Sequence, residues 1–269
     1  MNNRVNNFQL HYYGIFCLLA FLLADNAQAA DSSQTVNILE PSIADEFKQA
    51  QAIMSDRLDR VEDIEAIRRL QHTYGYFMDY CRYDDVIDLF AEDGEVIFLS
   101  GVYKGHDGLA RMYKILLGQV YTKGKTGPLY GFIADHHMMQ DVITVSKDRK
   151  TAKLRGRCYL TLGSHETRPD MPDHLPQQIY EAGLYENTYV RDNGVWKIQR
   201  LQYVLQWQSL YEKGWAHTAT DPALRPATQT YPENPIGPDY ILKEKQGLWP
   251  ERTPLEFHYV HPVTGKPLN

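Results

Sequence analysis

The sequence has little cysteine, no concentrated run of basic residues and no long apolar segment. Its 269 residues include 3 cysteines and carry a formal net charge of −6. Nucleic-acid binding depends on clustered lysine and arginine, so this mild acidity argues against a nucleic-acid partner. The chain also lacks a Gly-x-Ser-x-Gly sequence and a dinucleotide-binding glycine pattern. These absences argue against a serine nucleophile and against a nucleotide cofactor.

The main apolar segment, residues 13–24, is too short to cross a membrane as a mature helix. It spans 12 residues, whereas a membrane-spanning helix needs about 20. Arg4 precedes it and the small-residue sequence 27–29 follows it, which is typical of a signal peptide. We therefore expect cleavage near Ala29, export to a periplasm or beyond, and no stable membrane insertion after processing.

Removal of the signal peptide would leave two cysteines, Cys81 and Cys158. An exported protein can form a disulfide, but Cys81 falls at an expected helix end and Cys158 in an expected strand. We favour buried free thiols and keep a bridge as the alternative.

Aromatic residues are abundant, with 19 Tyr, 9 Phe and 4 Trp. A tyrosine ring offers a flat apolar wall with a polar tip, which suits a pocket for a hydrophobic, partly hydroxylated molecule. Many of these rings could instead pack at a subunit interface, and the two roles are compatible.

A helical period begins at Leu58. Apolar residues then recur at spacings of three and four as far as Phe77, which predicts an amphipathic helix. The preceding residues, 30–57, are polar and uneven, and we expect an extension with at most a short helix over 44–54. Two further helices are predicted at residues 83–91 and 106–117, with one strand between them at residues 95–100.

Four long strand-like runs follow the helices. They lie at residues 135–146, 151–162, 179–191 and 196–209. The sequence Asp192-Asn193-Gly194 between the last two runs predicts a hairpin turn. Helices followed by a curved antiparallel sheet make an α+β plan. The tail, residues 211–269, is rich in proline but keeps its aromatic residues, so we expect an extended arm packed on a partner subunit or over a pocket mouth.

This order resembles the SnoaL-like branch of the NTF2-like superfamily. The resemblance is carried by Leu70, Tyr74 and Asp79 on the first helix, by Asp135-His136-His137, and by the segment 183–196. It implies a cone of N-terminal helices on a strongly curved sheet around an apolar pocket, as in scytalone dehydratases and ketosteroid isomerases. The expected divisions are a signal peptide 1–29, an N-terminal extension 30–57, a SnoaL-like domain 58–210 and a C-terminal arm 211–269.

The resemblance implies that Asp79 closes the first helix, faces the cavity and is catalytic. Desolvation raises the pKa of a carboxylate in an apolar wall, and a paired imidazolium lowers it again. Such a pair can pass a proton near neutral pH, as an elimination or isomerisation requires. The alternative is that Asp79 caps the loop before the next helix.

His136 and His137 cannot both face the pocket, because neighbours on a strand point to opposite sides. The odd-numbered positions, which include Met139 and Ile143, form the more apolar face, so we expect His137 to point inward. Its spacing to the next strand resembles that of the catalytic histidine of scytalone dehydratase. His136 is the alternative, and either could be a core histidine with its hydrogen bonds satisfied. The second histidine of that enzyme has no counterpart, since the counted position falls near Leu162.

Tyr74 is a candidate to assist Asp79. The candidate substrate-binding residues are Tyr76, Tyr159, Tyr185 and Asn187. A His-His pair on a strand cannot supply two ligands to one ion, and no other metal-ligand spacing is present, so we expect no metal and no other cofactor.

These features predict a cofactor-independent enzyme, a lyase more than an isomerase, acting on a hydrophobic aromatic hydroxylated small molecule. By analogy with lyases of lignin-derived diarylpropanes, the reaction is an elimination or the loss of formaldehyde from a diarylpropane diol. The alternatives are a non-catalytic small-molecule-binding protein and a scaffold or assembly protein. We expect a homodimer or a homotrimer.

Overall fold

The computed structural model describes residues 33–171, 178–217, 227–244, 247 and 249–268. Its contacts divide the chain into two units, Met1–Arg57 and Leu58–Asn269. The expected signal peptide lies outside the described residues. None of the described helices is long and apolar enough to span a bilayer.

The first helix, α2 (Ser33–Asp79), is longer than the sequence indicated. The polar and uneven composition of residues 30–57 indicated at most a short helix over 44–54. Helix formation there does not depend on a buried face, since Phe47 and Met54 are exposed. No glycine or proline lies between Pro41 and Gly75, so nothing in that stretch opposes a continuous helix.

The remaining helices are short. They are α3 (Tyr83–Asp88), α4 (Gly105–Ala110), the π-helix η1 (Arg111–Leu117) and α5 (Gly118–Thr122). α4 and η1 together cover the region predicted as one helix at 106–117, and α5 continues it to Thr122. A π-helical turn often marks a functional region, and η1 contributes three residues to the cavity described below.

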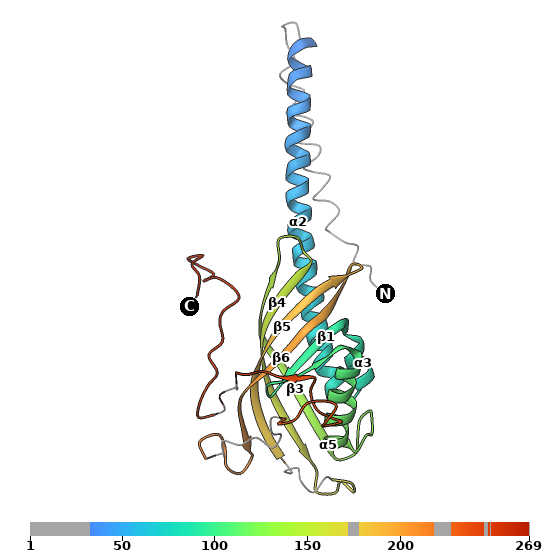
Figure 1. The fold of residues 1–269 in the computed structure, drawn as a ribbon. Coiled ribbons are helices and arrows are strands. Elements are labelled where there is room, and N and C mark those ends of the chain that lie inside the picture. The colour runs from blue at the N-terminus through green and yellow to red at the C-terminus, as the bar shows by residue number, and fades with distance from the viewer. Residues whose placement is uncertain (1–32, 172–177, 218–226, 245–246, 248, 269) are drawn as a thin grey trace, which may run out of the picture. The chain divides into compact units, whose positions relative to one another are not determined.

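The seven strands form one sheet in the order β3-β4-β5-β6-β1-β2-β7 (Figure 1). They are β1 (Phe90–Phe98), β2 (Gly101–Lys104), β3 (Phe132–Val145), β4 (Thr151–Ser164), β5 (Gln178–Asp192), β6 (Val195–Leu210) and β7 (Tyr240–Ile241). The pairing of β1 with β6 is parallel, so the sheet is mixed and not purely antiparallel as expected. The α+β cone fold is otherwise confirmed. The predicted turn between β5 and β6 is present, with Asn193 at φ 49° and Gly194 at φ 84°.

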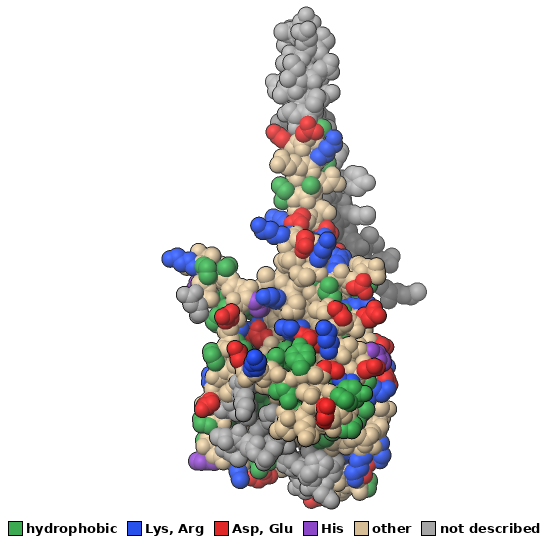
Figure 2. All heavy atoms as spheres, viewed as in Figure 1, with side chains coloured by type: hydrophobic (Ala, Val, Ile, Leu, Met, Phe, Trp, Pro, Cys, Tyr) green, Lys and Arg blue, Asp and Glu red, His purple; other side chains and the backbone are tan. Residues whose placement is uncertain are grey.

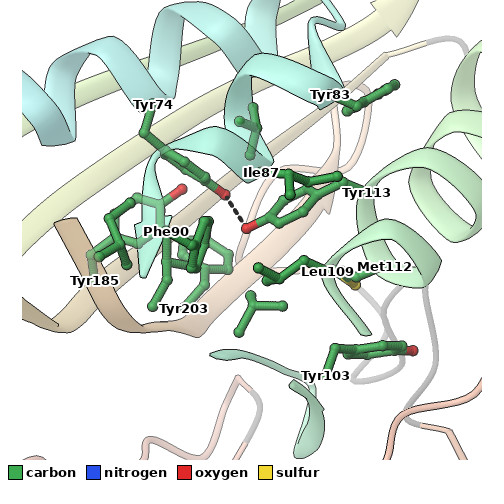
Figure 3. Close-up of a cluster of buried hydrophobic side chains, with 14 of the residues drawn as sticks. Tyr74, Tyr83, Ile87, Phe90, Tyr103, Leu109, Met112, Tyr113, Tyr185 and Tyr203 are labelled. Carbon is green, nitrogen blue, oxygen red and sulfur yellow. Dashed lines mark hydrogen bonds between the residues drawn. The ribbon is translucent and has the colours of Figure 1, made fainter. Parts of the chain in front are cut away.

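The core of the Leu58–Asn269 unit lies between α2, α3, η1 and the sheet. Buried tyrosines are prominent in it, and Figure 3 shows Tyr74, Tyr113, Tyr185 and Tyr203 turned toward one another. Cys81 and Cys158 are buried and unbridged. Figure 2 shows acidic and basic side chains interspersed on the visible face of this unit.

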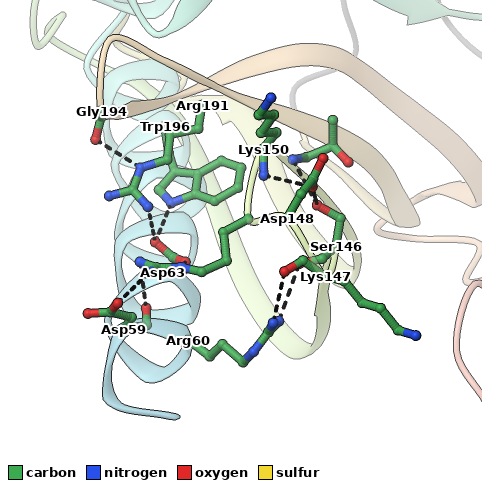
Figure 4. Close-up of polar contacts among 12 residues, drawn as sticks. Asp59, Arg60, Asp63, Ser146, Lys147, Asp148, Lys150, Arg191, Gly194 and Trp196 are labelled. Atoms are coloured by element: carbon green, nitrogen blue, oxygen red, sulfur yellow. Dashed lines mark hydrogen bonds and ion pairs between the residues drawn. The ribbon is translucent and has the colours of Figure 1, made fainter. Parts of the chain in front are cut away.

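A buried carboxylate joins α2 to the two hairpins of the sheet (Figure 4). Asp63 is 3 % exposed and accepts hydrogen bonds from Arg149 Nε at 2.6 Å and from Trp196 Nε1 at 3.0 Å. Arg191 forms a second ion pair with it at 3.1 Å. Burial alone would raise the pKa of Asp63, but these donors and positive charges lower it below its usual value. The cluster therefore holds an ionised aspartate against the sheet.

The described part of the C-terminal arm packs on its own chain. β7 pairs with β2, and Asp239 accepts hydrogen bonds from the Lys104 backbone at 2.8 Å and from Arg111 at 2.5 Å. The Arg111 guanidinium also stacks over Tyr231, 4.3 Å from the ring centre. The arm thus supports β2 and η1, and its packing on a partner subunit stays a prediction.

Candidate active site

A cavity of about 90 Å³ lies inside the core of the Leu58–Asn269 unit. A single buried water needs roughly 10–15 Å³, so the cavity has room for several waters or a small organic group. Apolar side chains with a few polar groups form the wall, which is the usual composition of a small-molecule site. The polar lining residues are Tyr74, Cys81, Tyr83, Tyr113, Tyr121, His136, Glu181, Tyr185, Tyr203 and Gln208.

His136 lies in the cavity wall and pairs with Asp79, the last residue of α2. Its Nδ1 is 2.7 Å from Asp79 Oδ1, and its backbone N–H donates to the same oxygen at 2.9 Å. β3 is an edge strand, which leaves this N–H available to a helix residue. The two side chains are 12 % and 16 % exposed. Asp79 thus ends the helix and meets a histidine, but it lies behind His136 and does not line the cavity, contrary to expectation.

The hydrogen bonds fix the tautomer of His136. An ionised carboxylate only accepts hydrogen bonds, so the Nδ1 that faces Asp79 carries the proton. In the neutral ring Nε2 is then the basic nitrogen. The pair can therefore present an oriented base to a molecule in the cavity, with a carboxylate behind it to stabilise the protonated ring.

The prediction that His137 points inward is wrong. His137 is exposed, and its ring lies 6.1 Å from that of Tyr159 on the other face of the sheet. On the inner face the cavity wall includes Ala134 and His136. The even-numbered positions face inward in this part of β3.

A β-bulge explains the error. Met139 pairs with Arg157 and Val142 with Arg155, so β3 has one more residue than β4 between these pairs. Gln140 in the bulge has φ 49°. An extra residue exchanges the two faces of a strand. Ile143, after the bulge, packs on the core as its apolar character indicated. Counting back from it by alternate residues, without the extra residue, gives the wrong face for His137.

Tyr74 and Tyr185, two of the candidate site residues, line the cavity. The Tyr74 hydroxyl lies 3.3 Å from that of Tyr113, and its ring meets Tyr185 edge-on at 5.9 Å between ring centres. Burial raises the pKa of all three phenols. These hydroxyls therefore stay protonated at neutral pH and can donate hydrogen bonds to a ligand oxygen.

Tyr76 and Tyr159 do not reach the cavity, which corrects two predicted binding residues. Tyr76 is 66 % exposed, because it lies two residues from Tyr74 and so about 200° around the helix. Tyr159 alternates with the buried Cys158 and Leu160 on β4, so its ring points outward.

Asn187 is buried, but it lies outside the cavity wall. Its amide donates to Gln71 Oε1 at 2.7 Å, and its Oδ1 accepts the Gln202 backbone N–H at 3.1 Å. Its hydrogen bonds therefore join α2, β5 and β6. The predicted substrate-binding role is not supported by this position.

Glu181 and Gln208 are cavity residues that the sequence analysis missed. The Gln208 amide donates to Glu181 Oε2 at 2.7 Å. Burial raises the pKa of Glu181, while hydrogen bonds from Gln208 and Tyr203 and the charge of His136 lower it in part. The strand period could have identified Glu181, because residues four positions apart on a strand share a face and Tyr185 was already a candidate.

In the described part of the chain, no group of three or more histidine, cysteine or acidic side chains is placed to hold a metal ion. Leu162, near which the position of the second histidine of scytalone dehydratase falls, forms part of the cavity wall. The fold and the site together define an α+β cone with a histidine–aspartate pair at a mainly apolar internal cavity.

The chain belongs to the family of SnoaL-like domains, whose model matches residues 59–202, more than half of its length. This match confirms the family indicated by the sequence. No curated protein sequence matches the chain.

Several solved structures are similar to it. A candidate scytalone dehydratase from Novosphingobium aromaticivorans is 19% identical, with a TM-score of 0.46 over 64% of this chain and 97% of that one. The hexachlorocyclohexane dehydrochlorinase LinA-type3 from Novosphingobium barchaimii is 18% identical, with a TM-score of 0.45 over 56% and 92%. An NTF2-like protein with a cystatin-like fold, also from Novosphingobium aromaticivorans, is 20% identical, with a TM-score of 0.42 over 61% and 92%.

Proposed function

We propose that this protein is a cofactor-independent acid–base lyase acting on a hydrophobic, aromatic, hydroxylated small molecule. The observation that carries the proposal is the His136 imidazole in the wall of a mainly apolar cavity, held by Asp79 at 2.7 Å. Membership of the SnoaL-like family is consistent with it, but a fold alone does not define a reaction.

His136 is the proton acceptor in this proposal. Its Nε2 removes a proton from the substrate, and Asp79 stabilises the imidazolium that forms. A base needs hydrogen-bond reach to the proton that it removes, which the position of the ring in the wall provides. Both expected reactions begin in this way, because an elimination loses a C–H proton and formaldehyde loss begins at the hydroxyl of a CH₂OH group.

The buried tyrosines supply binding and orientation. Tyr74, Tyr113 and Tyr185 offer aromatic surface together with protonated hydroxyls. An aromatic ring can pack against these rings, while its oxygen substituents accept hydrogen bonds.

The test is an activity screen of the purified protein without added metal or cofactor. The panel contains diarylpropane diols, hydroxylated polyketides, ketosteroids and β-hydroxypropiophenone. We expect wild type to turn over one compound class, and His136→Ala and Asp79→Asn to lose about 10²–10⁴-fold in rate. His137→Ala is the matched control, because it removes the neighbouring histidine outside the cavity and should keep wild-type activity.

Retention of activity by His136→Ala would contradict the proposal. If no compound is turned over but one of them raises the melting temperature of the wild type, a non-catalytic binding protein becomes the better account. The two outcomes use the same protein and the same panel.

A further inference from the structure

His136 and Glu181 lie in one row across the inner face of the sheet. In the strand register His136 is opposite Leu160, Leu160 is opposite Glu181, and Glu181 is opposite Gln208. All four side chains line the cavity. His136 and Glu181 are therefore two strand spacings apart, roughly 9–10 Å between their backbones. Their side chains lie on either side of the apolar Leu160.

The surroundings of Glu181 favour a protonated carboxyl. Among the described residues, no lysine or arginine lines the cavity. The charge of Glu181 helps to raise the pKa of Tyr121, Cys158 and Tyr203, so these three neighbours are neutral at physiological pH. His136 can carry a positive charge, and that charge lowers the pKa of Glu181 in part. Burial raises the pKa of Glu181 despite the hydrogen bonds that it accepts from Gln208 and Tyr203.

We propose that Glu181 is a second catalytic residue, the general acid that protonates the leaving oxygen while His136 removes the proton from carbon. This assignment rests on the proposed function. A substrate that lies over Leu160 would have its acidic C–H at His136 and its hydroxyl at Glu181. The two side chains then act on neighbouring carbons of one molecule.

The step balances as a dehydration. His136 Nε2 takes the proton from the α-carbon, and the electrons of that C–H bond form the C=C bond. The C–O bond at the β-carbon breaks, and its oxygen takes the proton of Glu181 and leaves as water. Transfer of a proton from imidazolium to carboxylate, through water in the emptied cavity, restores both groups. The substrate class is accordingly an aryl β-hydroxy carbonyl compound, or another aromatic compound with an acidic C–H bond and a hydroxyl group on the adjacent carbon.

The test compares two leaving groups on one carbon skeleton. β-Hydroxypropiophenone must lose hydroxide and needs a proton donor, whereas β-chloropropiophenone loses chloride and needs none. For Glu181→Gln we expect kcat to fall by about 10²–10⁴-fold with the hydroxy compound. With the chloro compound the same variant should lose less than about tenfold, because His136 still acts as the base.

Glu186→Gln is the matched control. Glu186 lies on the same strand, and burial raises its pKa as well. It differs from Glu181 in its ion pair with the Arg155 guanidinium outside the cavity, which favours the charged carboxylate. It should keep wild-type rates with both compounds. Equal losses by Glu181→Gln with both compounds would indicate a structural role and overturn the assignment, as would wild-type rates with the hydroxy compound.

Infrared difference spectroscopy separates this assignment from the proposed function. At neutral pH, subtraction of the Glu181→Gln spectrum from that of wild type should leave the C=O stretch of a protonated carboxyl, and the Glu186→Gln subtraction should not. Absence of that band overturns the role of Glu181 even if His136 proves to be catalytic. If wild type turns over no compound of the whole panel, the proposed function fails, and the band still decides whether Glu181 is an acid.

Discussion

Gly183 makes room for the Tyr203 ring at the cavity wall. A Cβ at this position would lie 2.3 Å from Tyr203 Cζ and 2.5 Å from its hydroxyl oxygen. Tyr203 in turn acts on Glu181 and lowers its pKa in part. The absent side chain at Gly183 therefore permits the contact that positions the carboxyl in the cavity.

Replacement of this glycine should affect both stability and the site. For Gly183→Ala we expect a loss of about 1–3 kcal/mol in the free energy of unfolding, because the Tyr203 ring must move in a packed core. Urea denaturation measures the change. Gly156→Ala is the control, since its Cβ meets only the end of a flexible leucine side chain at 3.1 Å. Equal stabilities of wild type and Gly183→Ala would show that the ring is not held as described.

Only part of the site could be predicted at the residue scale. Tyr74 follows from the regular period of the first helix and Asp79 from the family resemblance, and both residues contribute to the site. The inward histidine depends on an extra residue near Gln140, and glutamine rarely adopts the positive φ that it has there. Nothing in the local sequence indicated that change of face.

At the scale of elements, two aspartates fasten α2 to the sheet. Asp63 binds the arginines of the two hairpins, and Asp79 binds the backbone and ring of β3. Because Asp63 lies four turns before Asp79 on the helix, its ion pairs help to fix the helix end that orients His136.

Asp63→Asn should lower stability in a pH-dependent way. At neutral pH we expect a loss of about 1–3 kcal/mol, because two arginines lose a buried anionic partner. The pKa of Asp63 is lowered from 3.8 in the folded protein, so its contribution is complete above that pH and is lost as the pH falls through the folded value. Urea denaturation at neutral pH and at acidic pH should therefore show a difference that shrinks on acidification.

The control for this prediction is Asp85→Asn. Asp85 forms a solvent-exposed pair with Arg82 at 2.6 Å, and exposed pairs contribute little to stability, so this variant should match wild type. A difference between wild type and Asp63→Asn that stays constant at acidic pH would show that the charge of Asp63 is not the cause.

At the scale of the whole molecule, the order of elements was visible in the sequence but their pairing was not. The strand runs and the turn at 192–194 follow from local residue preferences. The parallel pairing of β1 with β6 and the return of β7 to β2 join residues more than a hundred positions apart. Such pairings depend on tertiary packing, which local sequence patterns do not indicate. The expected export and oligomeric state stay predictions.

The most direct test of this account is the protonation of the His136 ring, measured by long-range ¹⁵N–¹H NMR of the imidazole. The account predicts, for the neutral ring, a proton on Nδ1 and a basic Nε2, with Nε2 shifting when a ligand enters the cavity. Asp79→Asn should weaken the preference for this tautomer, and His137 should respond to neither change. A neutral His136 with its proton on Nε2, unaffected by Asp79→Asn, would contradict the central claim that Asp79 prepares His136 as the base of the cavity.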